Sequence, residues 1–305
     1  MTNKIKRNEG IQMLKFKPIE LKGKELIESH FKKENHFLCE YSFTDLFIWS
    51  KHYNTLFAEE EGFLYIKSDG DENTDYYMVP DGEGDFEKAM DRLFEYINEK
   101  GRKWLFVSIY PEQKEKLEKY YPGKYEFEEN RDNADYVYLA EKLATLSGKK
   151  LHKKKNHVNK FMKEYEGRWS YEELNDDNVR EFFNYQLDWC DLDNQFLGEL
   201  CAASIALRNY KELGIVGGIL RVDGKIAAVT LGSKSFDDTM IVHIEKADYN
   251  INGAYQVINQ QFVLHSCKDV KYVDREEDMG IEGLRKAKES YYPEFVTLNY
   301  TGRLK

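Results

Sequence analysis

Three side chains in the second half of the chain could move a proton during catalysis. His243 and Glu245 lie two positions apart in the apolar stretch MIVHIEKADYN, and in a regular strand such residues point to one face. Asp278 follows another apolar stretch, VKYVD, at a strand end where open α/β folds place ligands. Each residue could act as a general base. The structural alternative is a partly buried polar pair for the first two and a helix cap for Asp278.

A possible phosphate-binding turn follows the same strand. Asn250, Asn252 and Gly253 come directly before a predicted helix, AYQVINQQFVLHS. Glycine lets backbone N–H groups approach a phosphate, and the start of a helix adds positive potential. The alternative is an ordinary N-cap turn made by Asn252 and Gly253.

The segment GKKLHKKKNHVNKFMK, residues 148–163, is strongly basic although the whole chain has a net charge of -10. As a helix from about Leu151, it would present a basic stripe that could neutralise phosphates of a tRNA acceptor end, an anionic lipid headgroup or coenzyme A. The candidate residues are Lys153, Lys154, Lys155, Asn156, His157 and Lys160. The alternative is a solvated linker helix whose lysines interact with acidic domains on either side.

A second basic pair lies near the end of the chain. Arg285 and Lys288 are three residues apart in the predicted helix GIEGLRKAKESYYP, so they would share a face and could meet a phosphate or a carboxylate. The alternative is a solvated basic face.

Composition indicates a globular protein with room for two domains. The 305 residues are 41% hydrophobic, 33% charged and 14% aromatic, which argues against disorder. No apolar run reaches the roughly 18 residues that a membrane span needs, and the N-terminus lacks the apolar core of a secretory signal. The cysteines are scattered, which predicts reduced thiols in a cytoplasmic protein and no metal site.

Hydrophobic periodicity predicts a mixed α and β fold. The predicted strands are 62–68, 75–80, 104–110, 124–130, 134–143, three within 214–247, 270–274 and 295–304. The predicted helices are 85–101, 112–121, 252–267 and 280–293. The Asp223-Gly224 pair predicts a hairpin turn, and Gly101 is expected to end a helix whose apolar face carries Phe86, Met90 and Leu93.

A repeat relates the two halves of the chain. KLEKYYPGKYEFEEN and KAKESYYPEFVTLNY share a basic helix, then Tyr-Tyr-Pro, then a strand. A similar order of elements precedes both segments, which indicates a duplication. We therefore expect a tail over residues 1–12, one domain over 13–147 and a second over 148–305.

The order of elements resembles the fold of the GCN5-related N-acetyltransferases (GNATs), present here in tandem. The segments YSFTDLFIW, ADYVYLAEKLATLSGKKLHKKKNHVNKF and EDMGIEGLRKAKESYYP resemble an uncharacterised bacterial family related to the C-terminal domain of phosphatidylglycerol lysyltransferase. Fem-type aminoacyltransferases are similar in fold. The resemblance implies two GNAT-like α/β domains and an acyl- or aminoacyl-transferase that uses aminoacyl-tRNA or acyl-coenzyme A. In coenzyme A-dependent GNATs, however, Gln or Arg replaces Asn250, and Gly or Ala replaces Tyr255.

Three functional hypotheses stay open at this point. The first is a transferase with an amine, hydroxyl or lipid-headgroup acceptor, whose donor lies between the halves with the basic segment near the mouth. The second is a non-catalytic GNAT-like module that binds an anionic ligand. The third is a peripheral protein that contacts anionic lipid through Lys149–Lys163.

Overall fold

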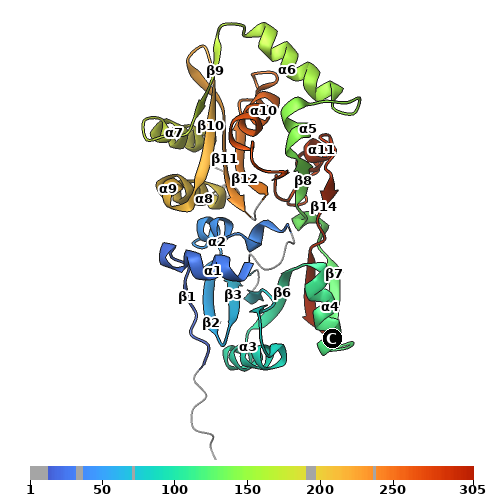
Figure 1. Ribbon diagram of the computed structural model, residues 1–305. Helices are drawn as coiled ribbons and strands as arrows, with labels where there is room; N and C mark the ends of the chain where they lie inside the picture. Colours follow the sequence, from blue (N-terminus) through green and yellow to red (C-terminus); the bar gives the residue numbers. More distant parts are fainter. Residues whose placement is uncertain (1–12, 32–36, 71–72, 190–196, 236–237) are drawn as a thin grey trace, which may run out of the picture.

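The computed structural model describes residues 13–31, 37–70, 73–189, 197–235 and 238–305 (Figure 1). The predicted tail over residues 1–12 lies outside these ranges. Two mixed sheets stand end to end, each flanked by helices (Figure 1). Among the described residues, no helix is both long enough and apolar enough to cross a membrane.

The first sheet has the order β1-β2-β3-β4-β6-β15-β7, with the short β5 paired to β3. Only β4 and β6 pair in parallel, and the other neighbours are antiparallel. The strands are β1 (Lys17–Pro18), β2 (Leu56–Glu60), β3 (Phe63–Asp69), β4 (Thr74–Tyr77), β5 (Asp81–Gly82), β6 (Lys103–Ile109), β7 (Tyr125–Glu129) and β15 (Tyr300–Leu304).

The second sheet repeats this pattern in the order β9-β10-β11-β12-β13-β8-β14. Again one neighbouring pair, β12 and β13, is parallel and the others are antiparallel. The strands are β8 (Tyr136–Leu139), β9 (Trp169–Glu173), β10 (Ile215–Val222), β11 (Lys225–Ser235), β12 (Thr239–Ala247), β13 (Tyr272–Asp274) and β14 (Phe295–Val296). The equivalent order of the two sheets supports the predicted duplication.

The two halves exchange one strand each. β8 follows β7 in sequence but joins the second sheet between β13 and β14, and β15 follows β14 but joins the first sheet between β6 and β7. The connecting segments cross and are hydrogen-bonded to each other: Asn130 N donates to Asn299 O at 2.7 Å and Thr297 N donates to Asp135 O at 3.0 Å. The chain therefore passes from the first sheet to the second before the predicted domain boundary between residues 147 and 148.

Two predicted strands were too long. Residues 295–304 form β14 and β15 in different sheets, because residues 297–299 belong to the crossing. Residues 134–143 form only the short β8, and a helix begins at Ala140. The prediction for residues 85–101 is confirmed: Phe86, Met90 and Leu93 are buried. Gly101 caps this helix in the left-handed region.

Helices cover both sheets and meet at their junction. In the first half these are η1 (Leu21–Gly23), α1 (Lys24–Phe31), η2 (Cys39–Tyr41), α2 (Phe43–Trp49), α3 (Phe86–Lys100), α4 (Pro111–Tyr120) and η3 (Arg131–Asn133). The later helices are α5 (Ala140–Thr145), α6 (His152–Glu164), α7 (Val179–Trp189), α8 (Leu197–Arg208), α9 (Tyr210–Leu213), α10 (Ala254–Ser266) and α11 (Glu282–Glu289).

One hydrophobic core runs across the junction of the halves. Phe43 and Leu46 of α2 pack in the same cluster as Ala203 of α8 and Leu231 and Ile244 of the second sheet. A second cluster lies under α10 and α6, and a third under α3. Burial of apolar side chains from both halves in one cluster stabilises their association, so polar groups at the junction are held on a fixed frame.

Candidate active site

A β-bulge in β12 places His243. The pairing of β11 with β12 shifts between Leu231↔Ile244 and Gly232↔Val242, which leaves His243 as an extra residue on β12. Gly232 permits this approach, because a Cβ atom there would lie 2.6 Å from the carbonyl oxygen of Ile241. Bulges of this kind redirect side chains and are frequent next to active sites.

The bulge reverses the alternation along β12. In a regular strand Val242 and Ile244 would share a face, yet Val242 packs in the cluster under α10 and Ile244 in the cluster at the junction. His243 bonds to Ser233 of β11, whereas Glu245 bonds to Asn259 of α10. The prediction that His243 and Glu245 share a face was therefore wrong, because the regular period of two does not hold through a bulge.

His243 is the centre of a hydrogen-bonded relay. Its Nδ1 lies 2.8 Å from Glu276 Oε1 and its Nε2 lies 2.8 Å from Ser233 Oγ. The carboxylate can only accept, which assigns the ring proton to Nδ1 and leaves Nε2 to accept from the Ser233 hydroxyl. The imidazole is fully buried, whereas the Glu276 side chain is 15% exposed. The order Ser-His-Glu is one that activates a hydroxyl or removes a proton.

The sequence contains no local signal for this relay. Ser233 precedes His243 by ten residues and Glu276 follows it by 33. The antiparallel pairing of β11 with β12 joins the first two, and the turn after β13 supplies the third. The predicted pairing of His243 with Glu245 therefore includes neither Ser233 nor Glu276.

Glu276 also borders a group of acids from both halves, which we call the junction carboxylates. They are Glu40, Asp45, Asp135, Asp274, Glu276 and Glu277. Ligand atoms of Cys39, Asp135 and Glu277 lie within 4.8 Å of one another, and so do those of Cys39, Asp45 and Glu276. Burial and the neighbouring carboxylates raise the pKa of Asp45 and of Asp135 well above its usual range. The same causes raise the pKa of Glu277 to about 7.

Lys288 supports the turn that carries Glu276. Its ammonium group donates to the backbone carbonyls of Arg275 at 2.5 Å and Glu276 at 2.9 Å, and also to that of Glu277. The residue is 7% exposed, and burial lowers its pKa. Because Lys288 points inward, it does not form with Arg285 the basic face that was predicted to bind an anion.

Asp278 is enclosed by hydrogen bonds. Arg285 binds both of its oxygens at 2.7 Å, Tyr136 Oη donates to it at 2.6 Å and Gly280 N at 2.9 Å. Burial alone would raise the pKa of Asp278, but these donors lower it to about 2. A carboxylate this acidic accepts a proton poorly near neutral pH, and Arg285 is further engaged by Asp132. Asp278 therefore has a structural role in the turn before α11, although it is not the predicted helix cap, because the N-cap residue is Ile281 and no side chain caps it.

Glu245 lies in a different charged group, on the α10 side of the second sheet. It accepts from Arg275 Nη2 at 2.7 Å and from Asn259 Nδ2 at 3.0 Å. The backbone pairing of β12 with β13 ends at Ile241 and Asp274, so the ion pair joins the two strands beyond their last pairing. Lys154 of α6 approaches this group, and burial together with Arg275 lowers its pKa to about 8.

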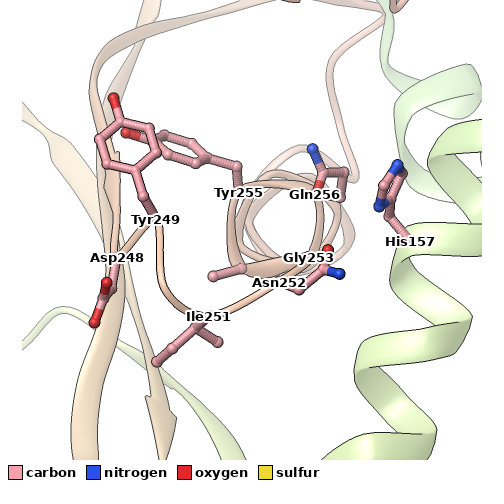
Figure 2. Close-up of a pocket in the computed structure, with 9 residues that line it drawn as sticks. His157, Asp248, Tyr249, Ile251, Asn252, Gly253, Tyr255 and Gln256 are labelled. Atoms are coloured by element: carbon pink, nitrogen blue, oxygen red, sulfur yellow. The ribbon is translucent and has the colours of Figure 1, made fainter.

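The predicted phosphate turn is packed against the basic helix. Gly253 has φ 91°, and a Cβ atom there would lie 2.9 Å from the carbonyl oxygen of His157. Asp248 accepts from the backbone and side-chain nitrogens of Asn250. A hollow of about 390 Å³ remains beside the turn, and Figure 2 shows His157 on one side of α10 with Tyr249 on the other. Asn252 and Gly253 line this hollow. Because Gly253 has no Cβ atom, α6 can pack closely against the turn.

The basic segment forms α6, with one buried and one solvated face. Val158 and Phe161 are buried, as is Leu151 before the helix. The exposed residues are Lys153, Lys155, Asn156, His157 and Lys160, while Lys154 is half-buried. Within the part of the chain that the structure describes, none of the lysines in 149–163 forms an ion pair.

The position of α6 differs from the expectation. It lies at the end of the second half that is remote from the first half (Figure 1), and it packs on α10. The basic segment is thus not near a mouth between the halves. The sequence predicts that the basic segment directly follows the first half, but β8 and α5 carry the chain along the second sheet before α6 begins.

Comparisons with known proteins agree with this architecture. A crystal structure of a conserved protein of unknown function from Bacteroides thetaiotaomicron is 37% identical, with a TM-score of 0.90 over 96% of this chain and 100% of that one. An uncharacterised protein of Mycoplasmoides gallisepticum is 28% identical over 180 residues, which are 56% of each chain. The match therefore spans about half the length of that relative.

More distant structures share the fold. L-PGS from Bacillus licheniformis is 14% identical, with a TM-score of 0.66 over 97% of this chain and 94% of that one. A tandem GNAT protein from the clavulanic acid pathway is 8% identical, with a TM-score of 0.51 over 95% and 98%. FemX is 7% identical, with a TM-score of 0.56 over 96% and 98%. The family model described as "Phosphatidylglycerol lysyltransferase, C-terminal" matches residues 31–301, so the chain belongs to that family and has the tandem GNAT fold.

Proposed function

We propose that this protein is an acyl- or aminoacyl-transferase, and that the relay of Glu276, His243 and Ser233 performs the proton transfer. The relay carries the proposal because it combines a histidine in a defined tautomer with a partly exposed carboxylate, at a bulge in a GNAT-like sheet. The family and the Fem-like fold support acyl or aminoacyl chemistry.

The relay suggests how transfer would proceed. The acceptor nitrogen or oxygen attacks the carbonyl carbon of an ester or thioester donor, the bond to the donor oxygen or sulfur breaks, and that leaving atom receives the proton that Glu276 has taken from the acceptor. Glu276, the exposed end of the relay, takes the acceptor proton while His243 holds the carboxylate in place. A positioned base of this kind contributes about 10²- to 10⁴-fold to rate. Lys288 is assigned a positioning role, since it fixes the three carbonyls of residues 275–277.

The roles proposed for Glu245 and Asp278 change accordingly. Glu245 is bound by Arg275 and Asn259, and Asp278 by Arg285 and Tyr136, so neither is our preferred base. A donor that approaches from α6 would instead meet three charged side chains, those of Glu245, Arg275 and Lys154. We assign these residues as candidates for orienting the donor.

The exposed face of α6 supports a polyanionic partner, with tRNA as the preferred candidate. Its lysines have no acidic partner among the described residues, and solvated lysines on one helix face bind phosphates with strong salt dependence. Coenzyme A is less well supported, because α6 packs against Gly253 where a pyrophosphate would approach. An anionic membrane surface is the remaining candidate, and vesicles with and without anionic lipid would separate it from tRNA.

A donor screen tests the proposed function. The protein is incubated with a labelled aminoacyl-tRNA pool, or with labelled acyl-coenzyme A, and with mixed amine and hydroxyl acceptors. We expect transfer of label to an acceptor, reduced at least tenfold in Glu276→Gln. Absence of transfer from every donor would leave the second hypothesis, a binding module, as the better account.

A further inference from the structure

We infer that the junction carboxylates bind a primary ammonium group, so that the acceptor is a cationic amine such as an aliphatic diamine. The identification of this amine as the acceptor rests on the proposed function, whereas its binding does not. The inference departs from an anionic lipid headgroup, whose phosphate a group of carboxylates would repel.

The first observation is an imbalance of charge. The six junction carboxylates come from η2, α2, the residue before β8, the end of β13 and the turn after it. The ammonium group of Lys288 lies nearby but is already bonded to three backbone carbonyls. Buried carboxylates without matching cations are costly, and a bound cation would remove that cost.

The second observation is that acceptor oxygens in this group lack donors. Asp135 is fully buried, and its Oδ1 has no hydrogen-bond partner among the described residues. Its other oxygen accepts from Cys39 N at 2.8 Å. The Asp45 carboxylate accepts no hydrogen bond from any described side chain. Asp135 and Asp45 belong to two groups that share Cys39, so the buried unpaired oxygen of Asp135 lies on a carboxyl group within this cluster.

The spacing suits an ammonium ion. In each of the two groups, two carboxylate oxygens and the Cys39 sulfur lie within 4.8 Å of one another. Two oxygens at about 2.8 Å from one tetrahedral nitrogen are about 4.6 Å apart, so each pair of carboxylates could accept two of the three ammonium hydrogens. The Cys39 thiol is oriented as a donor, with Sγ 3.7 Å from Glu40 Oε2 and 4.0 Å from Glu277 Oε2. A thiol that donates to carboxylates is protonated, while a metal would require the thiolate, so the arrangement favours an organic cation.

Binding here would place the amine beside its base. The ammonium transfers one proton to the Glu276 carboxylate, which gives a neutral amine and a carboxylic acid. The amine nitrogen then forms a bond to the donor carbonyl carbon, the bond to the leaving oxygen or sulfur breaks, and the second amine proton passes to that leaving group. A second ammonium on the same molecule would stay with the remaining carboxylates.

Calorimetry with cadaverine as the probe tests the inference. We expect wild-type protein to bind cadaverine and not 1-pentanol, and Asp45→Asn to weaken cadaverine binding about tenfold or more, the loss expected for one charge-assisted hydrogen bond. Asp91→Asn, an exposed residue of α3, is the matched control and should bind as the wild type does. Asp135→Asn is avoided because Asp135 also accepts from Cys39 N.

Two results would overturn the inference: no cadaverine binding, or binding that Asp45→Asn leaves unchanged. Tight binding of Zn²⁺ or Mg²⁺ that displaces cadaverine would make the site a metal site instead. The outcome is separable from the proposed function. Transfer to a hydroxyl acceptor without cadaverine binding removes only the inference, and cadaverine binding without any transfer removes only the transferase.

Discussion

The junction of the two halves and the remote end of the second half carry opposite charge and differ in how that charge is satisfied. At the junction, six carboxylates are enclosed by the fold and face one inward-pointing lysine. On α6, which lies at the remote end (Figure 1), most lysines are exposed, and none forms an ion pair with a described residue. The first arrangement can select a small buried cation, and the second can attract an extended anion. A net charge of -10 for the whole chain conceals both.

Local sequence accounts for the basic helix, whereas the topology of the fold brings the junction carboxylates together. The basic segment forms the predicted helix, and its buried face follows from the spacing of Val158 and Phe161. The junction carboxylates come from positions up to 237 residues apart, Glu40 and Glu277. Asp135 joins the others at the crossing that leads into β8, which belongs to the second sheet, and the sequence pattern of neither half predicts this exchange.

The largest effect should follow from breaking the junction at its one lysine. Lys288→Met removes the ammonium group that donates to the carbonyls of residues 275–277 and whose charge opposes the raised pKa of Asp274 and Glu277. We expect a loss of about 3 kcal/mol or more in the free energy of unfolding, measured by urea denaturation. Lys286→Met, an exposed neighbour on α11, should change it by less than about 1 kcal/mol. Equal values for the two variants would contradict the role assigned to Lys288.

A second effect concerns pH. The pKa of Glu277 is about 7 in the folded protein and near 4.5 when unfolded, so the unfolded chain binds fewer protons between these values. The contribution of Glu277 to the free energy of unfolding should therefore be most favourable below about pH 4.5 and should fall as the pH rises to 7. Glu277→Gln should recover about 2 kcal/mol at pH 8, less than the full shift because the residue is partly exposed. Thermal unfolding at pH 5 and pH 8 measures this difference.

The control for that experiment is Glu99→Gln, an exposed residue of α3. It should shift the melting temperature equally at the two pH values. If Glu277→Gln also shifts it equally, the carboxyl group is not held in its protonated form by the junction.

The smallest effect on the fold should come from the basic face. Lys153→Gln, Lys155→Gln and Lys160→Gln together should leave stability unchanged and weaken tRNA binding. The slope of log affinity against log salt should fall by about two to three, because three phosphate contacts are lost. A matched variant changes three exposed lysines on other elements, Lys51, Lys103 and Lys225. If both variants lose the same slope, α6 is not the binding face.

Part of the candidate site could be predicted from the sequence. His243 was selected from its place in an apolar stretch, and it lies at the centre of the relay. Its partners could not be predicted, because a bulge directs His243 away from Glu245 and toward Ser233. The spacing of residues in the sequence does not reveal a bulge. Lys288 was identified as a notable lysine, but three-residue spacing does not distinguish a solvated face from one turned to the core.

The most direct test of the central claim is transfer by His243→Asn, measured with the donor and acceptor that the screen identifies and compared with His265→Asn, a histidine at the end of α10 outside the relay. We expect His243→Asn to retain its fold by circular dichroism, to keep its affinity for the donor and to lose about 100-fold in rate, while His265→Asn keeps the wild-type rate. Full transfer activity in His243→Asn would contradict it.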